Sequence, residues 1–316
     1  MTGNKPKIVF MGTPEIAVTC LARLLNAGFS VAAVVTRIDK PQGRRAILTP
    51  PPVKVFAEER GIPVFQPRTL RDDGFSAWLD GVKPDLILVV AFGMILPENV
   101  IAYPKYGCIN VHASLLPKYR GAAPMQRAIM AGESETGVTI MYMDAGLDTG
   151  DMIVKGKTPI GDSDTLETIH DKLADIGADL LVDTVRTIAE GRNLPREKQN
   201  GEEAVYAAKI EREDARIDFA RSAPELDRLI RALTPIPYAF FTTKDGKTVK
   251  VLSAKPAEGQ GTPGTVLALS QEGTGYIRVA CGTGALDLTR IKPEGKGEMS
   301  AAEYLRGRKL AVGEAL

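Results

Sequence analysis

The chain has 316 residues, of which 44% are hydrophobic and 25% are charged, a composition typical of soluble globular proteins. A single core rarely extends beyond about 250–300 residues, so two domains are expected. The net charge of +1 excludes a global attraction to polyanions, and any nucleic-acid surface must therefore be local.

The cysteines and the hydropathy pattern exclude further classes. Cys20, Cys108 and Cys281 are far apart and odd in number, so they form neither a disulfide framework nor a CxxC metal site. The N-terminal segment lacks the apolar core of a signal peptide, and no apolar stretch approaches the roughly 20 residues that span a bilayer. We therefore expect a cytoplasmic protein that does not associate with membranes.

The first half of the chain alternates short β-branched runs with amphipathic segments. Strands are expected at 8–11, 31–36, 86–90 and 108–114, and helices at 14–28, 52–61 and 124–132. This rhythm predicts an α/β fold with a Rossmann-like, mostly parallel sheet and helices on both faces. A hairpin is expected at 136–143 and 152–160, followed by a long amphipathic helix from Thr165 to about Glu190.

The second half has a different pattern. A polar stretch without apolar periodicity is followed by a helix at 222–234 with Ser222 as its N-cap. Short strands are then expected at 247–254, 264–270, 276–282 and 285–291, which favours a small β-barrel of the OB type. The sequence therefore predicts a catalytic domain at 1–190, a linker at 191–208 and a β-barrel domain at 209–316.

One of the chain's two histidines lies where ligands usually bind in α/β sheets. Asn110 and His112 are two residues apart on a predicted strand, so their side chains point to the same face. The strand ends soon afterwards, and ligands bind at the carboxyl ends of strands in open α/β sheets. The pair can serve a reaction there, or it can simply satisfy backbone groups at the strand end. His170 falls inside the long helix and is expected to be structural.

Three aspartates, Asp144, Asp148 and Asp151, lie in the glycine-containing segment 143–151. An ordinary hairpin turn is one interpretation. A calcium loop is disfavoured because the D-x-[DN]-x-[DN]-G spacing and the closing glutamate are absent. A metal–histidine site is disfavoured because only one suitable histidine is available. We therefore expect no metal.

Several common enzyme motifs are missing. The glycine turn at 10–15 has a single glycine rather than G-x-G-x-x-G, and neither a P-loop lysine nor a G-x-S-x-G elbow is present. Dehydrogenase, NTPase and serine-hydrolase functions therefore lack their defining residues.

Residues 110–153 resemble the core of the folate-dependent formyltransferases. The catalytic set of that superfamily is Asn-x-His followed some 36 residues later by Asp, and Asn110, His112 and Asp148 match it. The resemblance extends from the MGTPE turn at 11–15 to the ARIDF segment at 215–219. The segments GAAPMQRAI and MDAGLDTGD are most similar to the enzymes that formylate methionyl-tRNA.

The resemblance implies 10-formyltetrahydrofolate as the co-substrate, held by two segments. The implied folate-binding residues are Phe92, Gly93, Met94, Ile95 and Leu96 from the first segment, and Ser114, Leu115, Leu116 and Pro117 from the second.

The resemblance also implies the reaction, which is formyl transfer to the α-amino group of methionyl-initiator tRNA for translation initiation. Asn110 and a protonated His112 would stabilise the oxyanion that develops as the amine attacks the formyl carbon. Asp148 would keep His112 charged and accept a proton from the amine, directly or through water. Neither a covalent enzyme intermediate nor a metal is needed.

A basic loop is the candidate tRNA contact. Segment 36–54 carries one acidic residue, Asp39, and five basic ones, which are Arg37, Lys40, Arg44, Arg45 and Lys54. In the family the matching loop enters the acceptor stem, so Arg37, Lys40, Arg44 and Arg45 are the expected tRNA-binding residues; a merely solvated loop is the alternative. From Lys209 onward 17 Lys+Arg stand against 14 Asp+Glu, the sign expected of an RNA-facing domain.

Three other functions share these features. A hydrolase could release formate from the same folate with the same three residues, and an aminosugar formyltransferase could use the barrel only as structure. A folate- or RNA-binding module without activity is the third. These functions are distinguished by whether the reaction requires an acceptor: formate release without tRNA would favour the hydrolase. Nothing in the sequence demands more than a monomer.

Overall fold

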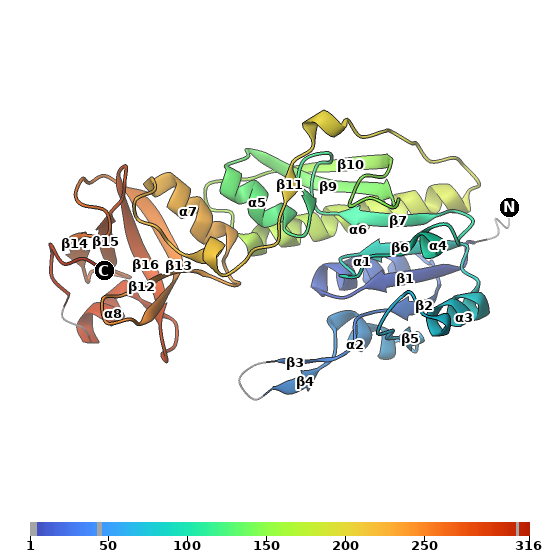
Figure 1. Ribbon diagram of the computed structural model, residues 1–316, viewed down its shortest axis with the longest axis horizontal. Coiled ribbons are helices and arrows are strands. Elements are labelled where there is room, and N and C mark those ends of the chain that lie inside the picture. Colours follow the sequence, from blue (N-terminus) through green and yellow to red (C-terminus); the bar gives the residue numbers. More distant parts are fainter. Residues whose placement is uncertain (1–4, 43–45, 308–309) are drawn as a thin grey trace. The chain divides into compact units, whose positions relative to one another are not determined.

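The computed structural model describes residues 5–42, 46–307 and 310–316, and the chain divides into two compact units (Figure 1). The first unit comprises the chain up to Gly121, together with Glu135–Pro159 and His170–Ala207. The second comprises Ala122–Ser134, Ile160–Ile169 and Ala208–Leu316. Each unit has its own core.

A seven-stranded sheet with the order β10-β9-β7-β6-β1-β2-β5 forms the centre of the first unit. Its strands are β1 (Ile8–Gly12), β2 (Val31–Val35), β5 (Val64–Phe65), β6 (Leu86–Val90), β7 (Cys108–His112), β9 (Glu135–Tyr142) and β10 (Met152–Pro159). The first five are mutually parallel, whereas β9 runs antiparallel to β7 and to β10. The predicted mostly parallel sheet and its later hairpin are therefore confirmed.

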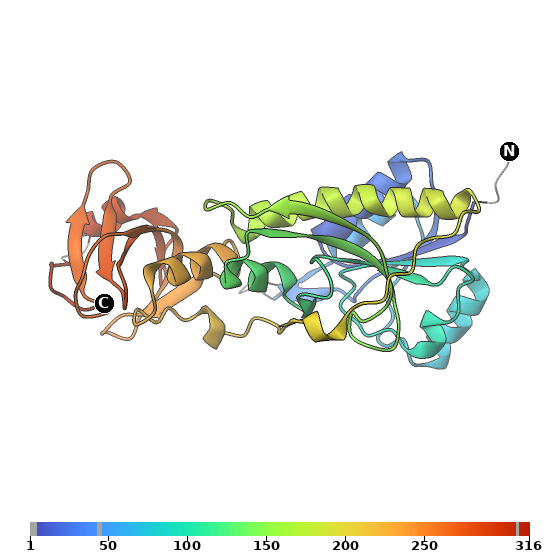
Figure 2. The same ribbon diagram turned by 90° about the horizontal axis from the view of Figure 1, so that it is seen from above.

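Helices cover both faces of this sheet, as predicted (Figure 2). Helices α1 (Glu15–Asn26) and α6 (Leu166–Ala189) lie on one face, where Arg23 pairs with Asp175 at 2.8 Å. Helices α3 (Asp73–Val82) and α4 (Glu98–Ile101) lie on the other and contribute to one core cluster. Because helices cover both faces, β1, β6 and β7 are buried along their whole length, which explains the uninterrupted apolar runs of β1 and β6.

The alternation along β7 places its polar side chains on the α3 face. A Cβ atom at Gly177 of α6 would lie only 2.9 Å from Val111 Cγ1, so Val111 faces α6 at close range. Cys108 belongs to the cluster that includes α3. Since side chains alternate along a strand, Asn110 and His112 share the face of Cys108.

An aromatic stack closes the α3 side of this core. The ring of Trp78, the only tryptophan of the chain, lies 4.8 Å from Phe65 with an angle of 6° between the rings. Phe75 stacks against both at centroid distances of 5.7 and 6.2 Å. The stack joins α3 to β5 at the edge of the sheet.

The second unit is built on an antiparallel sheet with the order β12-β13-β16-β15-β14, to which β17 adds by pairing with β16. Its strands are β12 (Ala239–Thr242), β13 (Thr248–Ala257), β14 (Val266–Ser270), β15 (Tyr276–Ala280), β16 (Ala285–Pro293) and β17 (Met299–Ser300). Helices α5 (Pro124–Ala131), α7 (Ala223–Ala232) and α8 (Ala301–Gly307) complete it. The predicted N-cap is confirmed, because Ser222 forms a capping box with Glu225.

The remaining elements are short. They are β3 (Lys40–Gln42), β4 (Ile47–Thr49), α2 (Pro52–Glu58), β8 (Arg120–Gly121), β11 (Tyr206–Ala207), and the 3-10 turns η1 (Gly201–Glu203) and η2 (Glu213–Ala215). The sequence predicted α2 but none of the others, and it also missed α3, α4, β5, β12, β17 and α8. Within the described residues, no helix is both long and apolar enough to cross a membrane.

Candidate active site

The site is built on the carboxyl half of β7, where two polar side chains are almost completely enclosed. Asn110 is 9% exposed and His112 is 6% exposed. They sit between β6 and β9, with Asn110 opposite Val89 on one side and Met141 on the other. Two neighbouring strands therefore fix the position of this pair.

Asp148 reaches His112 from the loop that joins β9 to β10. Its Oδ2 atom accepts a hydrogen bond from the Gly121 backbone N–H at 2.9 Å and lies 3.5 Å from His112 Nδ1. The latter distance allows attraction between charges but exceeds that of an ordinary hydrogen bond. Asp148 has a φ of 53°, in the left-handed region that non-glycine residues seldom adopt. The loop is thus held in an unfavourable conformation that directs this carboxylate at the histidine.

The other ring nitrogen of His112 is already committed. His112 Nε2 lies 2.9 Å from the carbonyl oxygen of Tyr119. A carbonyl can only accept, so Nε2 carries the hydrogen and donates it. Nδ1 is consequently the nitrogen that can exchange a proton or a partner on the Asp148 side.

The segment after β7 is folded tightly around buried polar groups. Ser114 is fully buried, and its hydroxyl donates to the Lys118 carbonyl at 2.7 Å. Thr139 of β9, also fully buried, donates to the Ser114 carbonyl at 2.7 Å and accepts from the Leu116 N–H at 3.1 Å. Leu116 packs with Met141 and Met152. The side chains of Ser114 and Leu116 are therefore buried in the protein, whereas Leu115 is partly exposed.

The first predicted folate segment, residues 92–96, likewise contains both buried and exposed side chains. Phe92 and Leu96 are 2% and 4% exposed and belong to the core cluster of the α3 face. Gly93 and Ile95 are exposed and Met94 is partly exposed, with Ile95 reaching 76%. The side chains available to a ligand are thus those of Met94 and Ile95, backed by their buried neighbours.

The predicted tRNA-binding residues differ in how far their side chains are engaged in contacts within the protein. Arg37 donates from Nη1 to the Gly93 carbonyl, which connects the basic loop to the segment 92–96. Lys54 pairs with Asp39 at 2.9 Å, and the Gln66 and Lys54 hydrogen bonds to that carboxylate lower the pKa of Asp39. Lys40 is exposed on β3. Arg44 and Arg45 lie outside the described residues.

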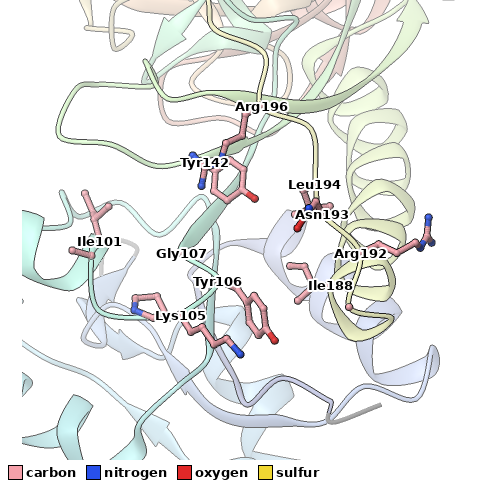
Figure 3. Close-up of a pocket in the computed structure, with 13 residues that line it drawn as sticks. Ile101, Lys105, Tyr106, Gly107, Tyr142, Ile188, Arg192, Asn193, Leu194 and Arg196 are labelled. Carbon is pink, nitrogen blue, oxygen red and sulfur yellow. The ribbon is translucent and has the colours of Figure 1, made fainter. Parts of the chain in front are cut away.

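A cavity of about 580 Å³ opens at the other end of β7, away from His112 (Figure 3). It is lined by residues that precede the strand, including Lys105 and Tyr106, and by Arg196, whose guanidinium lies 3.7 Å from the ring centroid of Tyr142. No group of three or more His, Cys, Asp or Glu side chains suited to a metal occurs in the described part of the chain.

The cysteines are not candidate nucleophiles. All three are free and buried, and burial raises the pKa of Cys108 to about 12. The reactive form of a cysteine is the thiolate, which is scarce in Cys108 at neutral pH.

Four residues of the site were missed by the sequence analysis. Tyr119 and Gly121 contribute backbone groups, which no side-chain motif reveals. Gln199 and Arg120 contribute a side-chain contact beneath the Asp148 loop, and Gln199 lies in a segment with no periodic pattern. Only the three-dimensional contacts identify them.

Comparison with known proteins identifies the family. Residues 6–185 match the formyl transferase family and residues 209–309 match its C-terminal domain. The methionyl-tRNA formyltransferase of Citrifermentans bemidjiense is 47% identical over 313 residues, covering 99% of this chain and 96% of that protein. The methionyl-tRNA formyltransferase of Stutzerimonas stutzeri is 50% identical over 298 residues, covering 93% of each.

Solved structures share the fold at lower identity. WlaRD, a sugar 3N-formyl transferase, superposes with a TM-score of 0.64 at 21% identity, covering 93% of this chain and 100% of that one. HypX from Aquifex aeolicus, solved with tetrahydrofolic acid, superposes with a TM-score of 0.63 at 20% identity, covering 96% of this chain and 47% of that one. Given the close relatives and both domain matches, the chain belongs to the methionyl-tRNA formyltransferase family, whose enzymes transfer a formyl group from 10-formyltetrahydrofolate to methionyl-tRNA.

Proposed function

We propose that this chain carries out the family reaction with Asn110, His112 and Asp148 as its catalytic residues. The observation that carries the proposal is the meeting of His112 and Asp148, 3.5 Å apart, at the end of the parallel sheet where α/β proteins bind ligands. Their positions in the sequence are far apart, and the loop of Asp148 adopts an unfavourable backbone conformation to reach the histidine.

Each of the three side chains has a role that its surroundings permit. Asn110 donates from its amide to the negative charge that develops on the formyl oxygen. His112, held through Nε2 by Tyr119, provides a second donor at Nδ1 when protonated. Donors enclosed in this way act without solvent reorganisation, and losing one typically costs about 2.7–4 kcal/mol of transition-state stabilisation.

Asp148 removes the proton that the attacking amine must lose during the transfer. The new bond joins the methionyl nitrogen to the formyl carbon, and the amine must lose a proton as that bond forms. Asp148 accepts this proton directly or through water, while its negative charge favours the protonated form of His112. The amine nitrogen that leaves the folate regains a proton within the same site.

The folate fits the wall formed by residues 92–96 and 114–117. Met94, Ile95 and Leu115 offer apolar surface at its accessible side, and Phe92 and Leu96 fix that surface from the core. A planar ring suits such a wall, because apolar contact holds the ring while a few polar groups orient it. We propose that Gly93, Ser114, Leu116 and Pro117 set the backbone shape of this pocket.

The preferred acceptor is initiator methionyl-tRNA. The exposed β3–β4 hairpin carries Lys40 and two exposed apolar side chains, Ile47 and Leu48, at 61% and 62%. A cation with apolar neighbours can contact both the phosphates and the bases at the end of an acceptor stem. We propose that the domain from Lys209 onward adds further phosphate contacts.

Two substitutions test the catalytic assignment. His112→Ala and Asp148→Asn should each abolish turnover and leave folate binding largely intact. An asparagine at 148 still accepts from the Gly121 N–H, so this variant should fold. His170→Ala and Asp162→Asn provide matched controls elsewhere in the chain. Near-normal formylation by His112→Ala or Asp148→Asn would contradict the assignment.

The acceptor is tested by comparing charged initiator tRNA with elongator methionyl-tRNA. Much faster formylation of the initiator is expected, with little formate released when no tRNA is present. Formate release independent of tRNA would instead indicate a hydrolase, and formylation of an aminosugar nucleotide would indicate the sugar enzymes.

We propose further that the protein acts in the cytoplasm as a monomer. Its three cysteines are unpaired, as is usual in a reducing compartment. Light scattering during size-exclusion chromatography tests the monomer: a mass near 33.9 kDa is expected, and twice that value would contradict it.

A further inference from the structure

We propose that Gln199 is a positioning residue that holds the loop of Asp148 in its catalytic conformation. The inference rests on the proposed role of Asp148 and extends it to the segment 196–207, here called the strap. The strap lies in the part of the chain that the sequence predicted to be a plain linker.

All hydrogen-bonding positions of the Gln199 amide are occupied. Its Nε2 donates to the carbonyl oxygens of Asp148 and Gly150, at 2.8 and 2.9 Å. Its Oε1 accepts from Arg120 Nε and Nη2, at 3.0 and 2.8 Å. Arginine only donates and carbonyls only accept, so the orientation of the amide is unambiguous. A side chain whose four bonds are all fixed holds its partners in one arrangement.

These partners are the side chain of Arg120 and the backbone of the Asp148 loop, and both belong to segments that contact the catalytic pair. The loop carries Asp148 itself, and Arg120 stands between the Tyr119 carbonyl and the Gly121 N–H. The first of these groups holds His112 Nε2 and the second holds the Asp148 carboxylate. Gln199 therefore connects the side chain of Arg120, whose neighbours contact the histidine and the aspartate, to the backbone of the loop that carries the aspartate.

The rest of the strap fixes Gln199 relative to both segments. On one side Glu197 forms a two-way backbone bridge with Met152, at 2.8 and 2.9 Å, just after the loop. On the other side β11 pairs with β8, where Tyr206 is opposite Arg120. A Cβ atom at Gly121 would lie 2.8 Å from the Tyr206 ring, which shows how closely the strap packs there.

The left-handed backbone of Asp148 explains why such a brace is needed. A non-glycine residue leaves this conformation readily unless its surroundings hold it. The Gly121 N–H holds the carboxylate, but the carbonyl of Asp148 is held by Gln199. Without the amide, the peptide after Asp148 can rotate and carry the carboxylate away from His112 Nδ1.

The test compares Gln199→Glu and Gln199→Ala with Asn200→Ala. A glutamate at 199 can still accept both hydrogen bonds from Arg120, but it cannot donate to the carbonyls of Asp148 and Gly150. The strap therefore stays bound to Arg120 while the Asp148 loop loses its two hydrogen bonds. Asn200 is the neighbouring amide of the strap, and its side chain bonds only to Glu202 and Glu203 among the described contacts. All three variants are assayed as the full chain with folate and charged initiator tRNA.

Gln199→Glu should lower kcat about tenfold to hundredfold, as expected when a reacting group is misplaced by an ångström or less. KM for both substrates should stay within about threefold, because neither substrate touches the amide. The pH profile of kcat should shift, since the separation of Asp148 and His112 changes. Asn200→Ala should leave kcat, both KM values and the pH profile unchanged.

Three outcomes would overturn the proposal. The first is a wild-type kcat in Gln199→Glu. The second is an equal loss in Asn200→Ala, and the third is a loss that follows the melting temperature without any change in the pH profile. Inactive Asp148→Asn with fully active Gln199→Glu would reject the brace alone, whereas active Asp148→Asn would reject the catalytic assignment itself.

Discussion

His112 Nε2 lies 2.9 Å from the carbonyl oxygen of Tyr119, and this contact determines which ring nitrogen is available for chemistry. The carbonyl keeps a hydrogen on Nε2 in every protonation state of the ring. Nδ1, 3.5 Å from Asp148 Oδ2, is therefore the atom that gains and loses the proton. A backbone group seven residues away thus selects the tautomer of the proposed catalytic histidine.

We predict that neutral His112 is the Nε2–H tautomer in the free enzyme. The chain has only two histidines, so nitrogen-15 spectra of the imidazole rings can be assigned with the single variant His170→Ala. The Nδ1 shift of His112 should move strongly with pH, whereas Nε2 should keep its protonated shift throughout. A neutral form with the hydrogen on Nδ1 would show that the Tyr119 contact does not persist in solution.

Thr139→Val should destabilise the first unit and weaken folate binding. The Thr139 hydroxyl is fully buried and satisfies the Ser114 carbonyl and the Leu116 N–H. Valine has the same shape but leaves both groups unpaired, which costs about 1–3 kcal/mol in a buried site. Urea unfolding measures the loss of stability, and the KM for folate measures the loss of folate binding. Thr139→Ser keeps the hydroxyl and should retain most of the folate affinity; equal losses in both variants would assign the effect to packing.

Arg37→Ala should weaken the use of both folate and tRNA, whereas Lys40→Ala should weaken the use of tRNA alone. Arg37 donates to the Gly93 carbonyl and so stabilises the proposed folate wall, but Lys40 is simply exposed on the hairpin. Loss of one charge-assisted hydrogen bond should raise the folate KM of Arg37→Ala about threefold to tenfold. Steady-state kinetics with each substrate varied in turn checks this, and an unchanged folate KM in Arg37→Ala would contradict it.

The capping box of α7 should make the stability of that helix depend on pH. Hydrogen bonds from the Ser222 hydroxyl and backbone N–H hold the pKa of Glu225 below the ordinary glutamate value. A carboxyl whose folded pKa is depressed stabilises the fold above its unfolded pKa, and that stability is lost as pH falls through the folded value. The stability is therefore lost as pH falls below the ordinary glutamate pKa of about 4.3 and through the lower folded value.

Ser222→Ala should remove most of this dependence. Amide hydrogen exchange in the first turn of α7 should be about fivefold faster than in the wild type at pH 7. The difference should shrink as acidification protonates Glu225 in both proteins. A difference that stays constant with pH would show that the serine acts only as a backbone cap.

The sheet and its helices were largely predictable because their signals are local. Short runs rich in β-branched residues located β1, β6 and β7, and alternation along β7 placed Asn110 and His112 on one face. Helix α3 was missed because it is short and interrupted by Gly74 and Gly81, although Phe75, Trp78, Leu79 and Val82 follow helical spacing on its apolar side. Local patterns thus give the elements but not every short one.

The site was less predictable, since its contacts join segments with no shared pattern. Asp148 was assigned from the family resemblance, because an aspartate in a glycine-rich turn has no distinguishing local signal. The resemblance implied folate contacts for Phe92 and Leu96, but it could not show that both side chains are buried in the core of the α3 face. Gln199 has no local sequence signal, because its hydrogen bonds join it to segments 51 and 79 residues earlier in the chain.

The single tryptophan has a practical consequence for every unfolding experiment on this protein. Trp78 is stacked on Phe65 in the first unit, so fluorescence excited selectively at tryptophan reports the unfolding of that unit and not that of the antiparallel sheet of the second. Circular dichroism, by contrast, reports the unfolding of both units. Two non-coincident transitions would mean that the units unfold independently, and a free energy taken from fluorescence alone would then describe only half of the chain.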